Sequence, residues 1–548
     1  MSAPSQHISV VAPGNQGLNT ELSPFQANQD FALRADNAVI DRVGRLSSRE
    51  AFADHVTRTD VTGNYDIVRI TTLEADEIDK EVVFGIAGKG RPIRSKSEKA
   101  AGMESATTFD LGLTDFTEYV GVVVDGDIVR EVPAVSPSNG LANCQLVPFK
   151  DAIYIFSKGD APMVYMGGSA TKLSDAPNYL PPTDVNGVPY SEEIDGDVAC
   201  AAYGRLWVSG VGGDYDRIYY SDLLIAEQWY DGTAAPDDEQ NTAGIINVAE
   251  YWPTGGDKIQ GIAAHNGFLI IFGRHSVLIY SGAQGDPAAE GGLKLEDAIR
   301  DVGLVNQDAM CNIGSDHLFV DNLGVRALGR VIQEKSSPLA EPSLNVSTDI
   351  RARIDGQSDT VRMFNMPRKS LAVCLFPEDS EAYVFQLGQP SASGGLRVTL
   401  WTGCDFYDGT TTRTDDGTLS LLAGRNSRGV TNYSGYSQPV NYTLRYESPV
   451  INAAGNVMTA MMPKSMSYSF YSRRQYGLNA TWGFGALMKY SRPVKSRNKT
   501  LETEFQTSSV SVNGSGEMLR VGFDVEISGD PIAMQQISIN AQAGRTIV

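Results

Sequence analysis

Short runs of β-branched and aromatic residues, bounded by Gly, Asn and Asp, recur through the middle of the chain. In each repeat a turn precedes an apolar strand, and a polar break separates that strand from a second one. The six repeats begin at residues 151, 204, 266, 315, 369 and 417, with the runs DAIYIF, GRLWVSG, NGFLIIFG, SDHLFV, KSLAVCLF and GTLSLLAG. This pattern predicts six β-hairpins.

The spacing of the repeats suggests how the hairpins pack. Their starts lie 48 to 62 residues apart, close to the roughly 50-residue period of kelch-type propeller blades. One hairpin cannot bury its apolar face alone, whereas radial stacking covers both faces of each small sheet. We therefore predict a mainly β protein with a β-propeller of about six blades. The alternative is a large β-sandwich of unrelated hairpins. The run NGFLIIFG is expected to be among the most buried segments.

The two ends of the chain have a different character. Residues 1–50 are punctuated by Gly and Pro without a strong period, which indicates an N-terminal arm laid over the body. Residues 51–440 would form the propeller. From residue 441 to 548, segments such as NYTLRYES and LRVGFDVEIS alternate with period 2, as half-buried antiparallel strands do. They predict a C-terminal antiparallel β domain or strands that close the propeller.

The charge of the chain restricts its partners. Its 548 residues carry a formal net charge of −21, which argues against binding nucleic acid by neutralising phosphates. An acidic wall is nevertheless compatible with DNA that passes without sticking. The first residues are polar, and no apolar run approaches the roughly 18 residues of a membrane span. We expect a soluble protein made in the cytoplasm.

One stretch departs from this acidity. No acidic residue lies between Glu447 and Glu502. The basic residues of this stretch are Lys464, Arg473, Arg474, Lys489, Arg492, Lys495, Arg497 and Lys499. They are a candidate docking surface for an acidic face of a neighbouring copy or for DNA, and the alternative is a solvated basic loop.

Catalytic and metal-binding patterns are absent from the sequence. It contains no Walker loop, GxSxG elbow or HExxH motif. Its five histidines share no metal-ligand spacing, and its five cysteines stand far apart, which favours buried free thiols. We predict no enzymatic activity, no cofactor and no catalytic or metal site. Aromatic residues in predicted loops, Trp229, Tyr230, Tyr251 and Trp252, suit either sugar stacking or a contact between subunits.

The N-terminal stretch GLNTELSPFQANQDFALRADNAVIDRVGRLSSREAF resembles the N-terminal signature of tail nozzle proteins, also called tail tubular protein B, of short-tailed bacteriophages. The matching positions are Gly17, Leu18, Asn19, Pro24, Ala35, Asn37, Ala38, Gly44, Arg45, Leu46 and Arg49. Residues 205–229, 255–282 and 302–328 are similar to successive blades of such proteins, and residues 529–545 are similar to their ends. Residues 51–140 and 440–515 show no such similarity.

This resemblance implies a structural virion protein. It would form a homo-oligomeric ring of several copies, with six expected, below the portal and adaptor rings of the phage tail. The ring would conduct genomic DNA without sequence-specific binding and anchor tail fibres or spikes. The family has no active site to transfer. The alternative function is a receptor-binding or carbohydrate-depolymerising tail protein.

Overall fold

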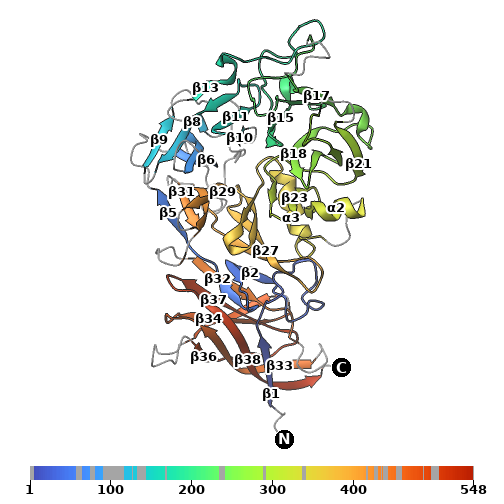
Figure 1. Ribbon diagram of the computed structural model, residues 1–548. Coiled ribbons are helices and arrows are strands. Elements are labelled where there is room, and N and C mark those ends of the chain that lie inside the picture. The colour runs from blue at the N-terminus through green and yellow to red at the C-terminus, as the bar shows by residue number, and fades with distance from the viewer. Residues whose placement is uncertain are drawn as a thin grey trace, which may run out of the picture.

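The structure is a computed structural model, and it is mainly β (Figure 1). The residues it describes are 5–56, 65–74, 81–90, 116–125, 128–132, 144–166, 170–233, 241–287, 292–335, 341–414, 417–424, 430–433, 435, 442–451, 459–485, 487–494 and 505–546. None of the helices within these ranges is long and apolar enough to cross a membrane.

Seven small antiparallel sheets follow one another from residue 65 to residue 433. The first four contain the strands β6 (Tyr65–Glu74), β7 (Glu81–Gly90), β8 (Phe116–Asp125) and β9 (Ile128–Val132); β10 (Cys144–Phe149), β11 (Ala152–Ser157), β12 (Met163–Tyr165) and β13 (Ala170–Lys172); β14 (Val198–Ala202), β15 (Arg205–Ser209), β16 (Arg217–Tyr220) and β17 (Gly244–Asn247); and β18 (Ile259–His265), β19 (Phe268–Gly273), β20 (Ser276–Ser281) and β21 (Lys294–Arg300).

The remaining three sheets have different outer edges. They contain β22 (Met310–Asn312), β23 (His317–Asp321) and β24 (Gly324–Ala327); β25 (Arg362–Met366), β26 (Leu371–Phe376), β27 (Glu381–Pro390) and β28 (Leu396–Thr402); and β29 (Phe406–Thr414), β30 (Gly417–Gly424) and β31 (Val430–Tyr433). The last sheet gains its fourth strand from far upstream, because β5 (Phe52–Val56) pairs antiparallel with β31.

The first strands of these sheets succeed one another around a common centre (Figure 1). β6 packs against β10, β10 against β14, β14 against β18, β22 against β25 and β25 against β29. β29 in turn packs against β6. The sheets of β19 and β23 meet through Phe272 and Phe319, whose ring centroids are 5.1 Å apart. The arrangement is therefore propeller-like.

Alternate residues of the middle strands enter different apolar cores. Leu269 and Ile271 of β19 pack in one cluster, and Ile270 and Phe272 pack in another. All four side chains are fully buried. Both faces of this sheet are thus covered by neighbouring sheets, which confirms the expectation for the run NGFLIIFG.

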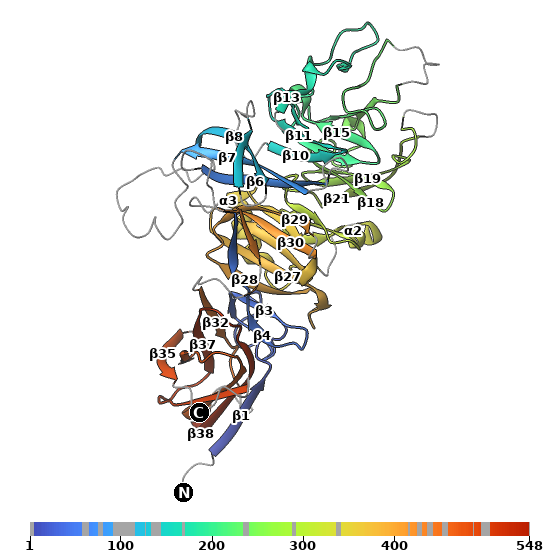
Figure 2. The ribbon, with the colours of Figure 1, turned by 60° about the vertical axis from the view of Figure 1, so that its left-hand side comes forward.

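A second unit lies beside the sheet of β25–β28. Its strands are β32 (Tyr442–Glu447), β33 (Thr459–Tyr471), β34 (Leu478–Phe484), β35 (Leu487–Val494), β36 (Phe505–Ser511), β37 (Leu519–Ile527) and β38 (Ala533–Thr546), together with β1 (Ser5–Val11), β2 (Arg34–Asp36), β3 (Ala38–Ile40) and β4 (Leu46–Ser48) from the N-terminal arm. One sheet has the order β3-β4-β38-β33-β36, with β1 paired to β38. β1 and β38 lie at the end of the molecule farthest from β13 and β17 (Figures 1 and 2).

β2 joins the two units. It pairs in parallel with β28 through Asp36 and Leu400 and antiparallel with β32. The resulting nine-stranded sheet has the order β25-β26-β27-β28-β2-β32-β37-β34-β35. The N-terminal arm therefore contributes strands to the sheets of the second unit, instead of packing over the surface of a folded body.

The helices formed by the described residues are few and short. They are α2 (Leu328–Glu334), α3 (Ser347–Gln357) and the 3₁₀ turns η2 (Leu173–Asp175), η3 (Val211–Gly213), η4 (Ala249–Tyr251) and η5 (Pro367–Lys369). α2 and α3 follow the three-stranded sheet and occupy the stretch of chain where its fourth strand would stand (Figure 1).

Each of the six predicted hairpins forms the second and third strands of one sheet. The described residues form seven such sheets, one more than the six predicted hairpins, and the additional sheet is β6–β9. The long segment between β7 and β8 removes the short turn by which the other hairpins are recognised. The expected boundaries at residues 50 and 440 fall between β4 and β5 and between β31 and β32.

Candidate functional site

The basic stretch is divided between two places. At one of them Lys464 of β33 and Arg492 of β35 meet at the end of β36. The backbone amide of Val512 donates to the carbonyl of Lys464 at 3.0 Å, and Arg492 Nη1 donates to the carbonyl of Ser511 at 2.7 Å. Lys464, Lys489 and Arg492 are all exposed.

Arg473 and Arg474 lie beyond the other end of β33. Arg474 Nη1 donates to the carbonyl of Ser528, and Gln506 Nε2 donates to the carbonyl of Arg474 at 2.9 Å. The nine residues from Lys464 to Arg473 correspond to roughly 30 Å of extended strand, so these residues do not form one patch. Lys495, Arg497 and Lys499 lie outside the described residues.

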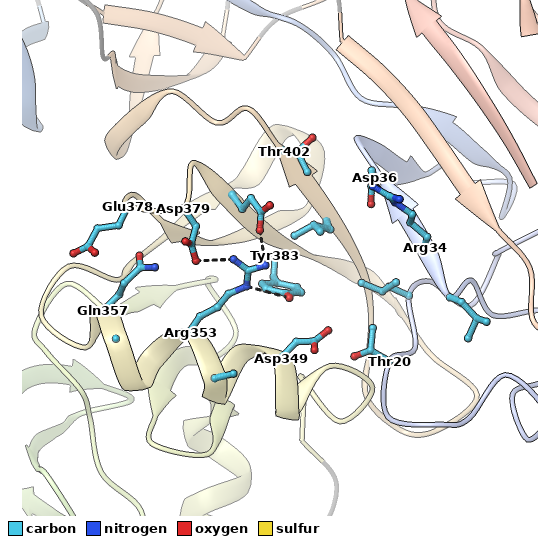
Figure 3. A pocket seen from close by; sticks show the side chains of 16 residues that line it. Thr20, Arg34, Asp36, Asp349, Arg353, Gln357, Glu378, Asp379, Tyr383 and Thr402 are labelled. Atoms are coloured by element: carbon cyan, nitrogen blue, oxygen red, sulfur yellow. Dashed lines mark hydrogen bonds and ion pairs between the residues drawn. The ribbon is translucent and has the colours of Figure 1, made fainter. Parts of the chain in front are cut away.

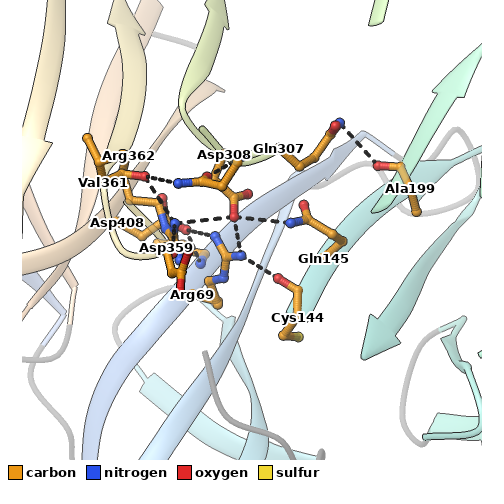
Figure 4. Close-up of polar contacts among 12 residues, drawn as sticks. Arg69, Cys144, Gln145, Ala199, Gln307, Asp308, Asp359, Val361, Arg362 and Asp408 are labelled. Atoms are coloured by element: carbon orange, nitrogen blue, oxygen red, sulfur yellow. Dashed lines mark hydrogen bonds and ion pairs between the residues drawn. The ribbon is translucent and has the colours of Figure 1, made fainter. Parts of the chain in front are cut away.

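A buried polar network crosses the centre of the propeller-like ring (Figure 4). Its hub is Asp308, in the segment that leads into β22. Arg69 Nη2 of β6 lies 2.5 Å from Asp308 Oδ2, and Gln145 Nε2 of β10 donates to the same oxygen at 3.1 Å. Arg362 Nη1 of β25 lies 3.4 Å from it. Arg69 Nη1 also lies 3.7 Å from Asp408 Oδ2 of β29.

The electrostatics of this network follow from burial and from two neighbouring arginines. Burial opposes ionisation of Asp308, but Arg69 and Arg362 outweigh it, so the pKa of Asp308 is lowered. Burial raises the pKa of Asp408 against the same two cations. Burial and repulsion by Arg69 lower the pKa of Arg362 to about 10. Ion pairs and hydrogen bonds of one charged cluster thus connect the first strands of several sheets.

This network lies between the first strands of the sheets at the centre of the ring. A cavity of about 380 Å³ lined by Arg69, Cys200 and Asp408 lies beside it. A second cavity, of about 250 Å³, is lined by Lys158, Tyr215 and Asp359. Gln145 and Gln307 line both cavities. A DNA duplex, whose major groove alone is roughly 12 Å wide, cannot pass through cavities of this size.

A cavity of about 660 Å³ lies where the ring meets the N-terminal arm (Figure 3). Arg353 projects into it from α3. Its Nη1 lies 2.7 Å from Asp379 Oδ2, its Nε donates to Tyr383 Oη at 3.4 Å, and its Nη2 pairs with Glu381. Across the cavity Arg34 Nε lies 2.6 Å from Asp36 Oδ2. We call this space the junction cavity.

The aromatic residues proposed for sugar stacking are mostly unsuited to it. Trp229 and Trp252 are 0% and 4% exposed and belong to two apolar cores. Tyr251 is 48% exposed, and Tyr230 is half-buried. Of the four, Tyr251 alone presents a large surface to a ligand.

No cluster of three His, Cys, Asp or Glu side chains in the described parts of the chain has the arrangement of a metal site. The five cysteines are free, and all but the half-buried Cys200 are buried. His265 contacts His317 at 5.3 Å between ring centroids, not the His275 that follows it in sequence.

Sequence reasoning missed both charged clusters. Arg69 and Asp308 lie 239 residues apart along the chain, and these two residues and Arg362 meet only because their segments surround one axis. The sequence offers one signal, which is a charged residue inside a run of strand-forming residues, as in VRMFNM at residues 361–366. Such a residue indicates a buried ion pair but not its partner.

Comparisons with known proteins leave the family open. No protein-family model matches the chain, and no curated protein matches it. Solved structures that are similar include the WD40 domain of Pan2 from Neurospora crassa (10% identity, TM-score 0.35, covering 69% of this chain and 91% of that one). PorZ from Porphyromonas gingivalis has 11% identity and a TM-score of 0.37, covering 83% of this chain and 56% of that one.

An exo-β-1,3-galactanase from Phanerochaete chrysosporium is also similar, with 9% identity and a TM-score of 0.25 over 90% of this chain and 100% of that one. These scores are too low to carry an argument about fold or function. The arrangement of the sheets therefore rests on the strand pairing described above.

Proposed function

We propose that this protein is a structural component of a phage tail, of the tail nozzle type, and that several copies form a ring around the path of the DNA. We further infer that its seven sheets are the blades of a closed propeller. The observation that carries the proposal is the position of the residues that resemble the nozzle signature. Asn37, Ala38 and Arg49 among them lie at the seam between the propeller-like ring and the second unit.

Asn37 is the centre of this seam. Its Nδ2 donates to Thr402 Oγ1 of β28 at 2.9 Å and to the carbonyl of Thr443 of β32 at 3.0 Å. Its backbone is left-handed, with φ 55°, a conformation that Asn tolerates better than most residues. Arg49 Nε donates to Asn37 Oδ1 at 3.0 Å.

Arg49 extends the seam into the apolar core. It is buried, and its guanidinium lies over the rings of Tyr442 at 4.2 Å and Phe52 at 4.5 Å. Ala38 accepts hydrogen bonds from Thr399 Oγ1 and Trp401 Nε1. These contacts hold the propeller-like ring and the second unit in one orientation. A fixed orientation suits a subunit of a larger ring, because each copy must position the copies around it accurately.

The filled axis of the propeller-like ring determines where DNA would pass. Because Asp308 and its partners occupy that axis, a conduit must be formed between copies. A net charge of −21 suits a wall that repels the duplex over the Debye length of about 8 Å at physiological salt. Portal or adaptor rings and tail fibres or spikes would be the neighbours, the virion the location, and no cofactor would be needed.

Negative-stain images of the purified full chain test this proposal. Rings with a central hole at least as wide as a duplex are expected. Elongated trimers without a hole would contradict the nozzle proposal and favour the alternative, a receptor-binding or carbohydrate-depolymerising tail protein. The buried positions of Trp229 and Trp252 do not favour that alternative.

A further inference from the structure

The sheet that contains β1 and β36 has two open edges in the second unit. β1 pairs with β38, β38 with β33, and β33 with β36. This sheet lies at the end of the molecule away from β13 and β17 (Figures 1 and 2). No described residue pairs with the outer side of β1 or with the outer side of β36. The backbone along these two sides is therefore available to a further strand.

Side-chain exposure agrees with the open edges. On the outer face of the sheet, Ser467 of β33 and Ser538 of β38 have neighbours on both sides and are half-buried. Residues of the same face on the edge strands have a neighbouring strand on one side, and most of them are exposed. The exposed residues are His7, Ser9 and Val11 of β1 and Phe505, Thr507 and Ser511 of β36.

Neither edge carries the features by which sheet edges usually avoid pairing. Charged side chains, proline and bulges protect such edges. β1 (SQHISVV) and β36 (FQTSSVS) contain no Lys, Arg, Asp, Glu or Pro, and their pairing with β38 and β33 runs without a bulge. β35, the edge of the nine-stranded sheet in the same unit, carries Lys489, Arg492 and Pro493. Protection is thus missing at these two edges and present at a neighbouring one.

The two open edges match each other in direction, length and face. Every pairing from β1 to β36 is antiparallel, so β1 and β36 run in opposite directions, and each has seven residues. When the two strands are opposed over their full length, Ser9 meets Thr507 and Val11 meets Phe505, all on the outer face. A shift by one residue would oppose core-facing and outward-facing side chains. Val11 and Phe505 are 57% and 42% exposed, and this register covers both.

The two edges cannot meet within one copy. β38 and β33 lie between them, which separates β1 from β36 by three strand spacings, or about 14 Å. A foreign strand would cover one edge and leave the other open, whereas a second copy supplies the matching edge. Arg492 Nη1 already donates to the carbonyl of Ser511 at one end of β36, so a partner strand need not pair with that carbonyl.

We propose that β36 of one copy pairs antiparallel with β1 of the next copy, so that the sheets of successive copies continue into one another. Backbone hydrogen bonds hold such an added strand, and Val11 packs against Phe505 beside them. A contact between two different surfaces closes a ring when the rotation per copy allows it, and a closed ring leaves neither edge open. This inference rests on the proposed ring and names the strands that build it.

Cysteines on the two edges test this register. In the variant Ser9→Cys with Thr507→Cys, the two new thiols of one copy stay about 14 Å apart. A disulfide needs Cα atoms within about 7 Å, so it can form only between copies, where the proposed pairing places these positions opposite each other. Oxidation should give a ladder of linked copies on a denaturing gel. The five native cysteines are free and mostly buried, and the wild type should give no ladder.

Three variants are the controls for this ladder. Ser9→Cys alone and Thr507→Cys alone should give none, because neither meets a second introduced thiol. Ser9→Cys with Asn479→Cys keeps two introduced thiols but places one on β34, where Asn479 is exposed and lies away from both edges. This variant should also give no ladder.

Like charges at the same contact measure its strength without a covalent link. Val11→Lys with Phe505→Lys opposes two cations between copies. The matched control, Tyr251→Lys with Leu323→Lys, makes the same change of charge at residues that are 48% and 41% exposed and lie outside the second unit. Sedimentation velocity at low salt should show self-association at least about tenfold weaker in the edge variant and unchanged in the control. Both variants should melt close to the wild type, because all four positions are exposed.

The outcomes separate the strand contact from the proposed function. Wild-type rings without a ladder from the double cysteine variant would overturn the strand contact and leave the nozzle proposal standing. Self-association that the edge variant leaves unchanged would do the same. Linked dimers from either single cysteine variant would indicate that like edges pair about a two-fold axis, which would overturn the head-to-tail contact. A monomeric wild type without a ladder would overturn both proposals.

Discussion

His317 is buried with both ring nitrogens unpartnered among the described residues. It stands at the start of β23, next to His265. Burial first, and then repulsion from His265, lower the pKa of His317 to about 4 against a weaker opposing effect of Asp316. The folded protein thus holds this imidazole neutral at pH values where an unfolded chain protonates it.

The stability of the fold should therefore fall as the pH is lowered from about 6.5 to 4. In that interval the unfolded chain binds a proton at His317 that the folded chain does not, and the loss reaches about 3 kcal/mol. Below pH 4 both states are protonated and the contribution is constant. Urea unfolding of wild type and His317→Leu at pH 7 and pH 4.5 measures the effect, and the variant should lose less stability on acidification.

The exposed His275 supplies the control for this experiment. His275→Leu removes a histidine from a solvated position and should retain the acid sensitivity of the wild type. Equal acid sensitivity in all three proteins would contradict the assignment of the effect to His317.

Single residues were predicted from the sequence only where their chemistry is local. The free cysteines could be inferred from composition and spacing. The hub at Asp308 could not, because Arg69 and Arg362 belong to strands that are distant in sequence. The basic residues were visible as a charge asymmetry, but their division into two groups depends on the pairing of β33 with β36.

The arm lies close against the ring at Gly17. Its φ is 85°, and a Cβ there would lie 2.7 Å from both the backbone N and O of Val398 in β28. Gly44 has nearly the same φ of 84°, with nothing within 4 Å of its Cβ position. Gly44→Ala should therefore cost about 1–2 kcal/mol for the left-handed backbone alone.

Gly17→Ala adds a clash with backbone that cannot rotate away, and should cost about 3 kcal/mol or more. Thermal unfolding of the two variants measures the difference. If the two melt together, the approach of the arm to β28 is not as close as the structure has it.

β19 allows a similar comparison within one strand. Ile270 is 0% exposed, whereas Phe268 is 36% exposed. Ile270→Asp places an unpaired charge between two sheets and should abolish soluble expression. Phe268→Asp should change stability by about 1 kcal/mol or less. The yield of soluble protein distinguishes the two variants. A soluble Ile270→Asp variant that melts like the wild type would show that this strand is not part of the core.

At the level of elements, the sequence predicted the middle strands because both of their faces are apolar. The outer strands were harder to predict from the sequence, since many of them are short and partly solvated. β2, β3 and β4 have three residues each, too few to show a period. The sheet of β6–β9 lacks the short central turn, so its strands did not register as a repeat.

For the whole molecule we expect no carbohydrate-cleaving activity. Hydrolysis needs one carboxyl group that keeps its proton and a second that is ionised. In the junction cavity the Asp379 and Glu381 carboxylates both pair with Arg353. Incubation with capsular or lipopolysaccharide sugars should release no reducing ends. Sugar cleavage that the substitution Glu378→Gln abolishes would contradict this expectation and would favour the depolymerase alternative over the nozzle proposal.

The pairing of β5 with β31 has a consequence for synthesis. Val56 pairs with Val430, so roughly 370 residues must be translated after β5 before its partner exists, which takes about 20 to 75 s at bacterial elongation rates. The four sheets from β10 to the three-stranded sheet are contiguous in sequence and can form as they emerge. β5 must wait, and its unpaired edges are open to other chains until β31 has been made. The ring can thus be fastened only when its last strand has left the ribosome.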